Sequence, residues 1–115
     1  MTLGVELRTL VLSLRDPFVI ARASHGESGR SVTTVVAELR DDADGPSGPV
    51  GLGEGYPDTF YGETPETMAA VMPGLLAAVE PLGAALRGAP DEARAALDKA
   101  GASMAGVINH HGAAK

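Results

Sequence analysis

The three histidines are the first residues to consider for metal binding or acid–base chemistry, because this 115-residue chain has no cysteine. His110 and His111 are adjacent, and adjacent helical side chains point about 100° apart, so they cannot hold one ion from one face. Zinc sites use spacings such as i and i+4. His25 has no partner beyond the neighbouring Glu27 to make it a general base. We therefore interpret the adjacent pair as structural or exposed, and predict no catalytic or metal-binding residue in this chain.

A long segment rich in glycine, serine and arginine, residues 17–30 (PFVIARASHGESGR), connects two predicted strands. Hairpin loops usually have about two to five residues, and longer loops in compact domains are commonly functional or disordered. Arg22 or Arg30 could bind a carboxylate through paired hydrogen bonds from the guanidinium. The segment is a candidate lid or specificity loop, with a mobile surface loop as the alternative.

The most distinctive segment is residues 51–64 (GLGEGYPDTFYGET), which holds three of the four aromatic residues: Tyr56, Phe60 and Tyr61. Alternating glycines weaken a strand and mark a bulge or a close backbone approach. Exposed rings on a loop indicate a ligand or a covering domain. The simpler explanation is a turn in which Tyr56-Pro57 seals the edge of the sheet.

The elements that must position these loops fall into two halves, strands over residues 4–56 and helices after them. Three strands joined by a loop and a hairpin predict an antiparallel meander. They are expected at residues 5–14, 31–40 and 49–54. In the first strand the apolar alternation slips between Leu7 and Leu10, which a bulge or a strand covered on both faces would explain. Asp16-Pro17 ends that strand, because proline cannot donate to a ladder.

The second half predicts a small helical bundle. Thr64 is a good N-cap, and Pro73 and Pro81 should break the first helical stretch into short segments. A second helix is expected over residues 90–100 with Gly101 as its C-cap. A third should begin near Asn109 and still be running at Lys115. The class is α+β, with the sheet first and the helices after it.

The amino-acid composition argues against some classes of binding partner and predicts a small hydrophobic core. The net charge of −6 argues against nucleic acid and anionic membranes. We expect no membrane span and no secretion signal, hence a cytoplasmic protein. Alanine accounts for 19 of the 115 residues, which predicts a thin core that another body covers on one face. An ending inside a predicted helix favours a piece of a longer polypeptide over a frayed terminus.

The order of these motifs resembles the N-terminal capping domain of the enolase superfamily, in its muconate-lactonizing group of cycloisomerases, succinylbenzoate synthases and dipeptide epimerases. Five segments carry the resemblance: Pro17-Phe18, Ser31–Leu39, Gly51–Glu54, Tyr61–Thr64 and the tail Asn109–Lys115. It spans nearly the whole chain, and the order and spacing of the motifs are more specific than any one of them.

The resemblance implies a cap over residues 1–108, with residues 109–115 beginning the segment that leads into a (β/α) barrel absent from this chain. In that family, barrel lysines move a proton next to a substrate carboxylate, and barrel acidic residues hold the Mg²⁺ that stabilises the enediolate. The cofactor Mg²⁺ would therefore be bound by the missing barrel, and this chain alone would be inactive. The implied partners are a small carboxylate substrate, the chain's own barrel and further copies in a homo-oligomer.

The resemblance also implies that two loops, residues 18–30 and 54–61, face the substrate. The substrate-binding residues would be Phe18, Ile20, Arg22, Ser24, Tyr56, Phe60 and Tyr61. In dipeptide epimerases an arginine of the first loop commonly binds a substrate carboxylate, and Arg22 lies near that place. The favoured activity is epimerisation of a dipeptide or an N-acyl amino acid. A muconate or chloromuconate cycloisomerase or a succinylbenzoate synthase is the runner-up, and a free-standing, non-enzymatic binding module is the alternative of another class.

Overall fold

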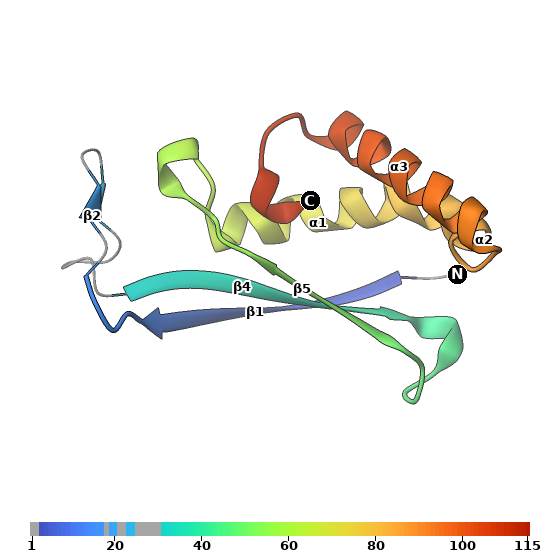
Figure 1. The fold of residues 1–115 in the computed structure, drawn as a ribbon, viewed down its shortest axis with the longest axis horizontal. Helices are drawn as coiled ribbons and strands as arrows, with labels where there is room; N and C mark the ends of the chain where they lie inside the picture. Colours follow the sequence, from blue (N-terminus) through green and yellow to red (C-terminus); the bar gives the residue numbers. More distant parts are fainter. Residues whose placement is uncertain (1–2, 18, 21–22, 25–30) are drawn as a thin grey trace.

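A computed structural model describes residues 3–17, 19–20, 23–24 and 31–115. Strands come first and helices follow (Figure 1). The strands are β1 (Leu3–Ser13), β2 (Val19–Ile20), β3 (Ala23–Ser24), β4 (Ser31–Asp41) and β5 (Val50–Gly55). The helices are α1 (Pro65–Val79), α2 (Gly83–Leu86) and α3 (Pro90–Val107). Short 3₁₀ turns are η1 (Asp42–Asp44), η2 (Thr59–Tyr61), η3 (Glu80–Leu82) and η4 (Gly112–Ala114).

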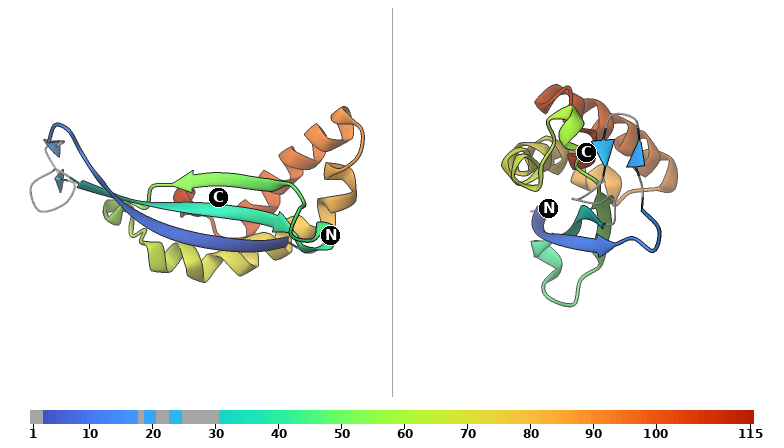
Figure 2. Two further views of the ribbon diagram at one scale, coloured as in Figure 1. Left: turned by 90° about the horizontal axis from the view of Figure 1, so that it is seen from below. Right: turned by 90° about the vertical axis from the view of Figure 1, so that its left-hand side faces the viewer.

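The sheet confirms the predicted antiparallel meander, with strand order β1-β4-β5. The pairing of β1 with β4 runs without interruption from Leu7 opposite Ala37 to Leu10 opposite Thr34, so the predicted bulge is wrong. The strand is not covered on both faces either, because Val11 is 69% exposed. The far ends of β1 and β4 extend past the helices (Figure 2), and Leu10, Val11 and Leu12 of β1 are exposed.

The helical half differs from prediction in three places. Pro73 lies inside an unbroken α1. Proline has no N–H, so the carbonyl of Ala69 lacks its helical donor, and the helix tolerates this because both residues are exposed. Gly101 lies within α3, which continues to Val107. The tail forms no helix from Asn109, because His111 adopts a left-handed backbone with φ 78° and only the short turn η4 follows. The break at Pro81 is confirmed, since it lies in η3.

The core is thin, as the alanine content predicts. Its buried apolar cluster joins β4, α1 and the tail through Val35, Met68, Leu75 and Ala114. Small residues, Ala96 and Ala100, are the buried positions of α3. The burial between the two layers therefore comes from few large side chains.

The alternating glycines of β5 face the helices, because Gly51, Gly53 and Gly55 pair with the inward-facing residues of β4. At Gly55 a Cβ atom would overlap the carbonyl oxygen of Ala113, so the predicted close approach is confirmed there. At Gly53 a Cβ would meet nothing within 4 Å. Here an apolar groove of about 360 Å³ lies between the sheet and helices α1 and α3.

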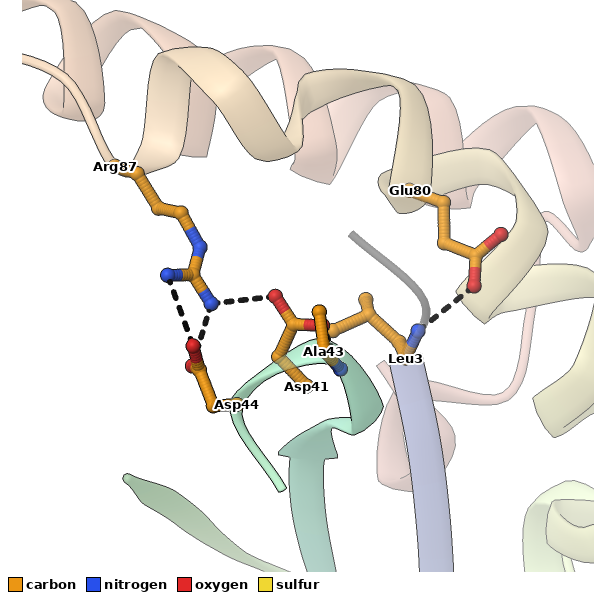
Figure 3. Close-up of polar contacts among 6 residues, drawn as sticks. All are labelled: Leu3, Asp41, Ala43, Asp44, Glu80 and Arg87. Carbon is orange, nitrogen blue, oxygen red and sulfur yellow. Dashed lines mark hydrogen bonds and ion pairs between the residues drawn. The ribbon is translucent and has the colours of Figure 1, made fainter. Parts of the chain in front are cut away.

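Polar contacts tie the two layers at the end where β1 begins (Figure 3). Arg87, after α2, donates to Asp41 at 2.5 Å and to Asp44 at 2.6 Å. These hydrogen bonds, the one to Asp44 first and then the one to Asp41, raise the pKa of the Arg87 guanidinium. The Leu3 N–H donates to Glu80 Oε1 at 2.8 Å, which fastens the start of β1 to η3.

By length and composition alone, the stretch Pro65–Leu86 could cross a membrane. The mean hydropathy of its most apolar 18-residue window is 1.6. One such stretch is weak evidence for a span, because the mostly buried core helix of a soluble protein passes the same test, so the absence of a span stays a prediction. Here 17% of the window is buried, and the buried residues of α1 are Met68, Met72 and Leu75.

Candidate functional site: the aromatic loop

Residues 56–62, here called the aromatic loop, leave the end of β5 and return to the start of α1. Asp58 organises the loop, because its Oδ1 accepts from the Phe60 N–H at 2.9 Å and its carbonyl accepts from the Tyr61 N–H at 2.9 Å. Gly62 closes the turn in the left-handed region, with φ 76°. A capping aspartate and a glycine at these two places explain why this sequence forms one tight turn.

The three rings of the loop are presented to solvent. Tyr56, Phe60 and Tyr61 are 41%, 55% and 64% exposed. Phe60 and Tyr61 pack edge to face, with ring centroids 5.0 Å apart and an interplanar angle of 88°. Pro57 is buried, so this residue closes the turn against the body while the rings do not. The loop thus offers a fixed aromatic surface.

Tyr56 is the ring whose ionisation the structure perturbs. Partial burial raises the pKa of its phenol, and the negative charge of Asp58 raises it further. Both causes disfavour the phenolate. Tyr56 therefore stays a neutral hydrogen-bonding group well into the alkaline range.

The first predicted loop reaches the same end of the molecule. In Figures 1 and 2 the β2–β3 hairpin and the aromatic loop rise at one end of the sheet, on the side that carries the helices. Ile20 lies in β2 opposite Ala23, and Ser24 lies in β3 opposite Val19. Phe18 and Arg22 lie outside the described residues.

The sequence did not predict the buried polar cluster behind the aromatic loop. His111 is buried, which fits the structural interpretation, whereas His110 is exposed. The Nε2 atom of His111 shares a hydrogen bond with the Thr67 hydroxyl, and Nδ1 lies 3.9 Å from Oε1 of Glu63. The predicted N-cap at Thr64 located the start of α1, which forms one side of this cluster. Nothing in the sequence indicates that Thr67 contacts a histidine 44 residues further along the chain.

Metal-donor side chains do not cluster in the described part of the chain. Over residues 3–17, 19–20, 23–24 and 31–115, no group of three or more histidine, aspartate or glutamate side chains lies together in a way that could hold a metal ion. Glu54 accepts a hydrogen bond from the Thr34 hydroxyl at 2.9 Å and so has a structural contact within the sheet. We derive no chemical step through a metal held by these residues.

Searches against protein-family models and curated proteins gave no match. Among solved structures, the chain is similar to a dipeptide epimerase from Methylococcus capsulatus complexed with Mg and the dipeptide L-Arg-D-Lys, with a TM-score of 0.45 and 21% sequence identity. The match covers 80% of this chain and 28% of that protein. The chain thus spans little more than a quarter of that protein's length, and activity, substrate and partners are taken up below as proposals.

Proposed function

We propose that this chain is the substrate-specificity cap of a Mg²⁺-dependent isomerase of the enolase superfamily. The observation that carries the proposal is that the β2–β3 hairpin and the aromatic loop both rise at one end of the sheet, on the side of the helices. Two loops that follow different strands and lie at one end can close over a substrate held by another domain. The order of the sequence motifs supports the same assignment.

The proposed substrate is a dipeptide or an N-acyl amino acid, and the proposed reaction is epimerisation at the carbon next to its carboxylate. The exposed rings of Tyr56, Phe60 and Tyr61 suit an apolar or cationic substrate side chain. We assign the substrate carboxylate to Arg22. Proton transfer and Mg²⁺ binding belong to a barrel domain outside this chain, and a cycloisomerase remains the second candidate within the family.

The test uses the complete natural polypeptide that contains these residues, assayed with Mg²⁺ on a panel of dipeptides by chiral separation of the products. We expect Tyr61→Ala to change the ratio of kcat/KM values between substrates by about tenfold or more, since one buried apolar contact is worth about 1–3 kcal/mol. Bound Mg²⁺ should stay at the wild-type level.

The matched control is Leu97→Ala, which removes an exposed apolar side chain from α3, away from both loops. It should leave the substrate ratio unchanged. An unchanged ratio in both Tyr61→Ala and Arg22→Ala would contradict the assignment of the loops. Turnover of muconate with no epimerisation of any dipeptide would instead favour the cycloisomerase.

A further inference from the structure

A buried polar network joins three segments that are distant in the sequence. His111, in the tail after α3, shares a hydrogen bond through Nε2 with the Thr67 hydroxyl in the first turn of α1. Its Nδ1 faces Oε1 of Glu63, the residue after the aromatic loop, at 3.9 Å. The side chains of His111 and Glu63 are only 6% and 11% exposed. The network therefore connects the tail, the start of α1 and the aromatic loop.

Glu63 holds the aromatic loop closed from one side. Its N–H donates to the Asp58 carbonyl at 3.2 Å, and its Oε2 accepts from the Asp58 N–H at 3.4 Å. Phe60 and Tyr61 lie between these two anchoring residues. The Glu63 carboxylate is therefore one of the contacts that hold the turn from which both rings project.

The proton positions in the network favour a contact from His111 to Glu63. The Thr67 hydroxyl accepts from the Thr64 N–H at 2.9 Å, and its own proton can go either to the Thr64 carbonyl, 2.9 Å away, or to Nε2 of His111. The Thr64 carbonyl already accepts from the Met68 N–H at 3.0 Å, so the hydroxyl proton can serve Nε2 without leaving that carbonyl unsatisfied. With Nε2 accepting, Nδ1 carries the imidazole proton and can donate to the carboxylate. The opposite tautomer would set the Nδ1 lone pair against a negative charge.

The Nδ1 atom is buried and makes no hydrogen bond within the part of the chain that the structure describes. Buried polar atoms are normally satisfied, and Glu63 is the acidic group that faces this one. The histidine also holds a left-handed backbone, which residues other than glycine, asparagine and aspartate seldom adopt. We propose that His111 is a positioning residue that acts through Glu63 to set the conformation of the aromatic loop. What the loop then selects rests on the proposed function, but the positioning is a property of this chain alone.

The test can be read without a substrate, because Tyr56 and Tyr61 are the only tyrosines and the chain has no tryptophan. The near-ultraviolet circular dichroism of the tyrosines therefore reports on the aromatic loop. His111→Asn keeps an amide N–H where Nδ1 was and tolerates the left-handed backbone. His111→Gln places its amide nearer the position of Nε2, and Glu63→Met removes the acceptor at similar volume.

We expect His111→Asn to keep the tyrosine band, and His111→Gln and Glu63→Met each to lose most of its intensity while the far-ultraviolet spectrum is unchanged. The double variant should lose no more than either single one, because both changes break one contact. His110→Asn, at the exposed neighbouring position, is the control and should keep the wild-type band.

Equal loss in His111→Asn and His111→Gln would overturn the proposal, because the histidine would then act through Thr67 or through packing. An unchanged band in Glu63→Met would overturn it as well, and this variant decides the matter if the His111 variants do not fold. Neither result depends on whether the chain caps an isomerase, so the failure of this inference and the failure of the proposed function are distinguishable.

Discussion

Tyr56, Phe60 and Tyr61 present their rings on a backbone that is fixed before any ligand arrives. The Asp58 side chain caps the turn, and Gly62 supplies the left-handed residue that closes it. A loop ordered in advance loses little conformational entropy on binding, so its contacts contribute more fully to affinity. At the scale of single residues, the loop resembles a preformed binding surface more than a flexible connection.

Alkaline titration tests the environment of Tyr56. In Tyr61→Phe, Tyr56 is the only tyrosine, and its absorbance near the phenolate band should titrate with a midpoint above the ordinary value of 10.0. Because the folded pKa is raised, the stability that Tyr56 contributes is fully present below pH 10 and is lost as the pH rises through the folded pKa.

The control for this titration is Asp58→Asn in the same background, since asparagine keeps the N-cap and removes the charge. Its midpoint should lie below that of the parent and still above that of the denatured chain, because burial is the larger cause of the shift. A folded midpoint at or below the denatured one would contradict this environment.

The glycines of β5 determine what lies against this strand, because they have no side chain. Gly55 lets the tail lie against the strand at Ala113, whereas Gly53 opens into the groove between the layers. The two positions lie on the same face of the same strand, two residues apart. They form a matched pair in which the same substitution should have opposite effects.

Gly53→Ala should raise the free energy of unfolding by about 0.4–1 kcal/mol, because it restricts the unfolded chain and meets open space in the fold. Gly55→Ala should lower it by about 1–3 kcal/mol, because the new Cβ must displace the backbone at Ala113. Urea denaturation of both variants measures the difference. Equal effects of the same sign would show that the tail does not dock against β5.

Local patterns predicted β1, β4, β5 and the start of α1 closely, since alternation and capping depend on neighbouring residues, whereas the short strands β2 and β3 within the first predicted loop were missed. The same reasoning was wrong at Gly101 and Pro73, where exposed positions of a packed helix tolerate residues that usually end one. The contact of His111 with Thr67 and Glu63 could not be predicted, because it is made only when the tail folds back onto α1. Exposure of the three rings was predicted because they lie together in one turn.

For the whole molecule, polar contacts join the sheet to the helices at one end and the tail to α1 at the other. Arg87 with Asp41 and Asp44, and Glu80 with Leu3, join them where β1 begins (Figure 3). The hydrogen bond between His111 and Thr67 joins the tail to the start of α1. The apolar groove lies between these contacts. Polar contacts therefore supplement a core that is small for this length.

Arg87→Gln should lower the melting temperature, because it removes the cation that faces the largely buried Asp41 carboxylate. The loss should be greater at low ionic strength, since the Arg87 side chain is half exposed and salt screens its charge. Thermal unfolding with and without added salt measures both effects. Arg94→Gln, on the exposed side of α3, is the control; an equal, salt-independent loss in both variants would contradict the role of the ion pairs.

The overhang of β1 beyond the helices has a consequence for handling the protein. Residues 9–14 (TLVLSL) form an uncharged run on an edge strand, and Leu10, Val11 and Leu12 are exposed. Such segments recruit strands from other molecules and seed aggregates. Arg8 and Arg15 flank the run as gatekeepers, although Arg8 is paired with Glu6 at 3.2 Å and with Glu38 at 3.7 Å. Concentrated samples should therefore remain clear at low ionic strength, where the net charge of −6 keeps the molecules apart, and become turbid as salt screens that charge.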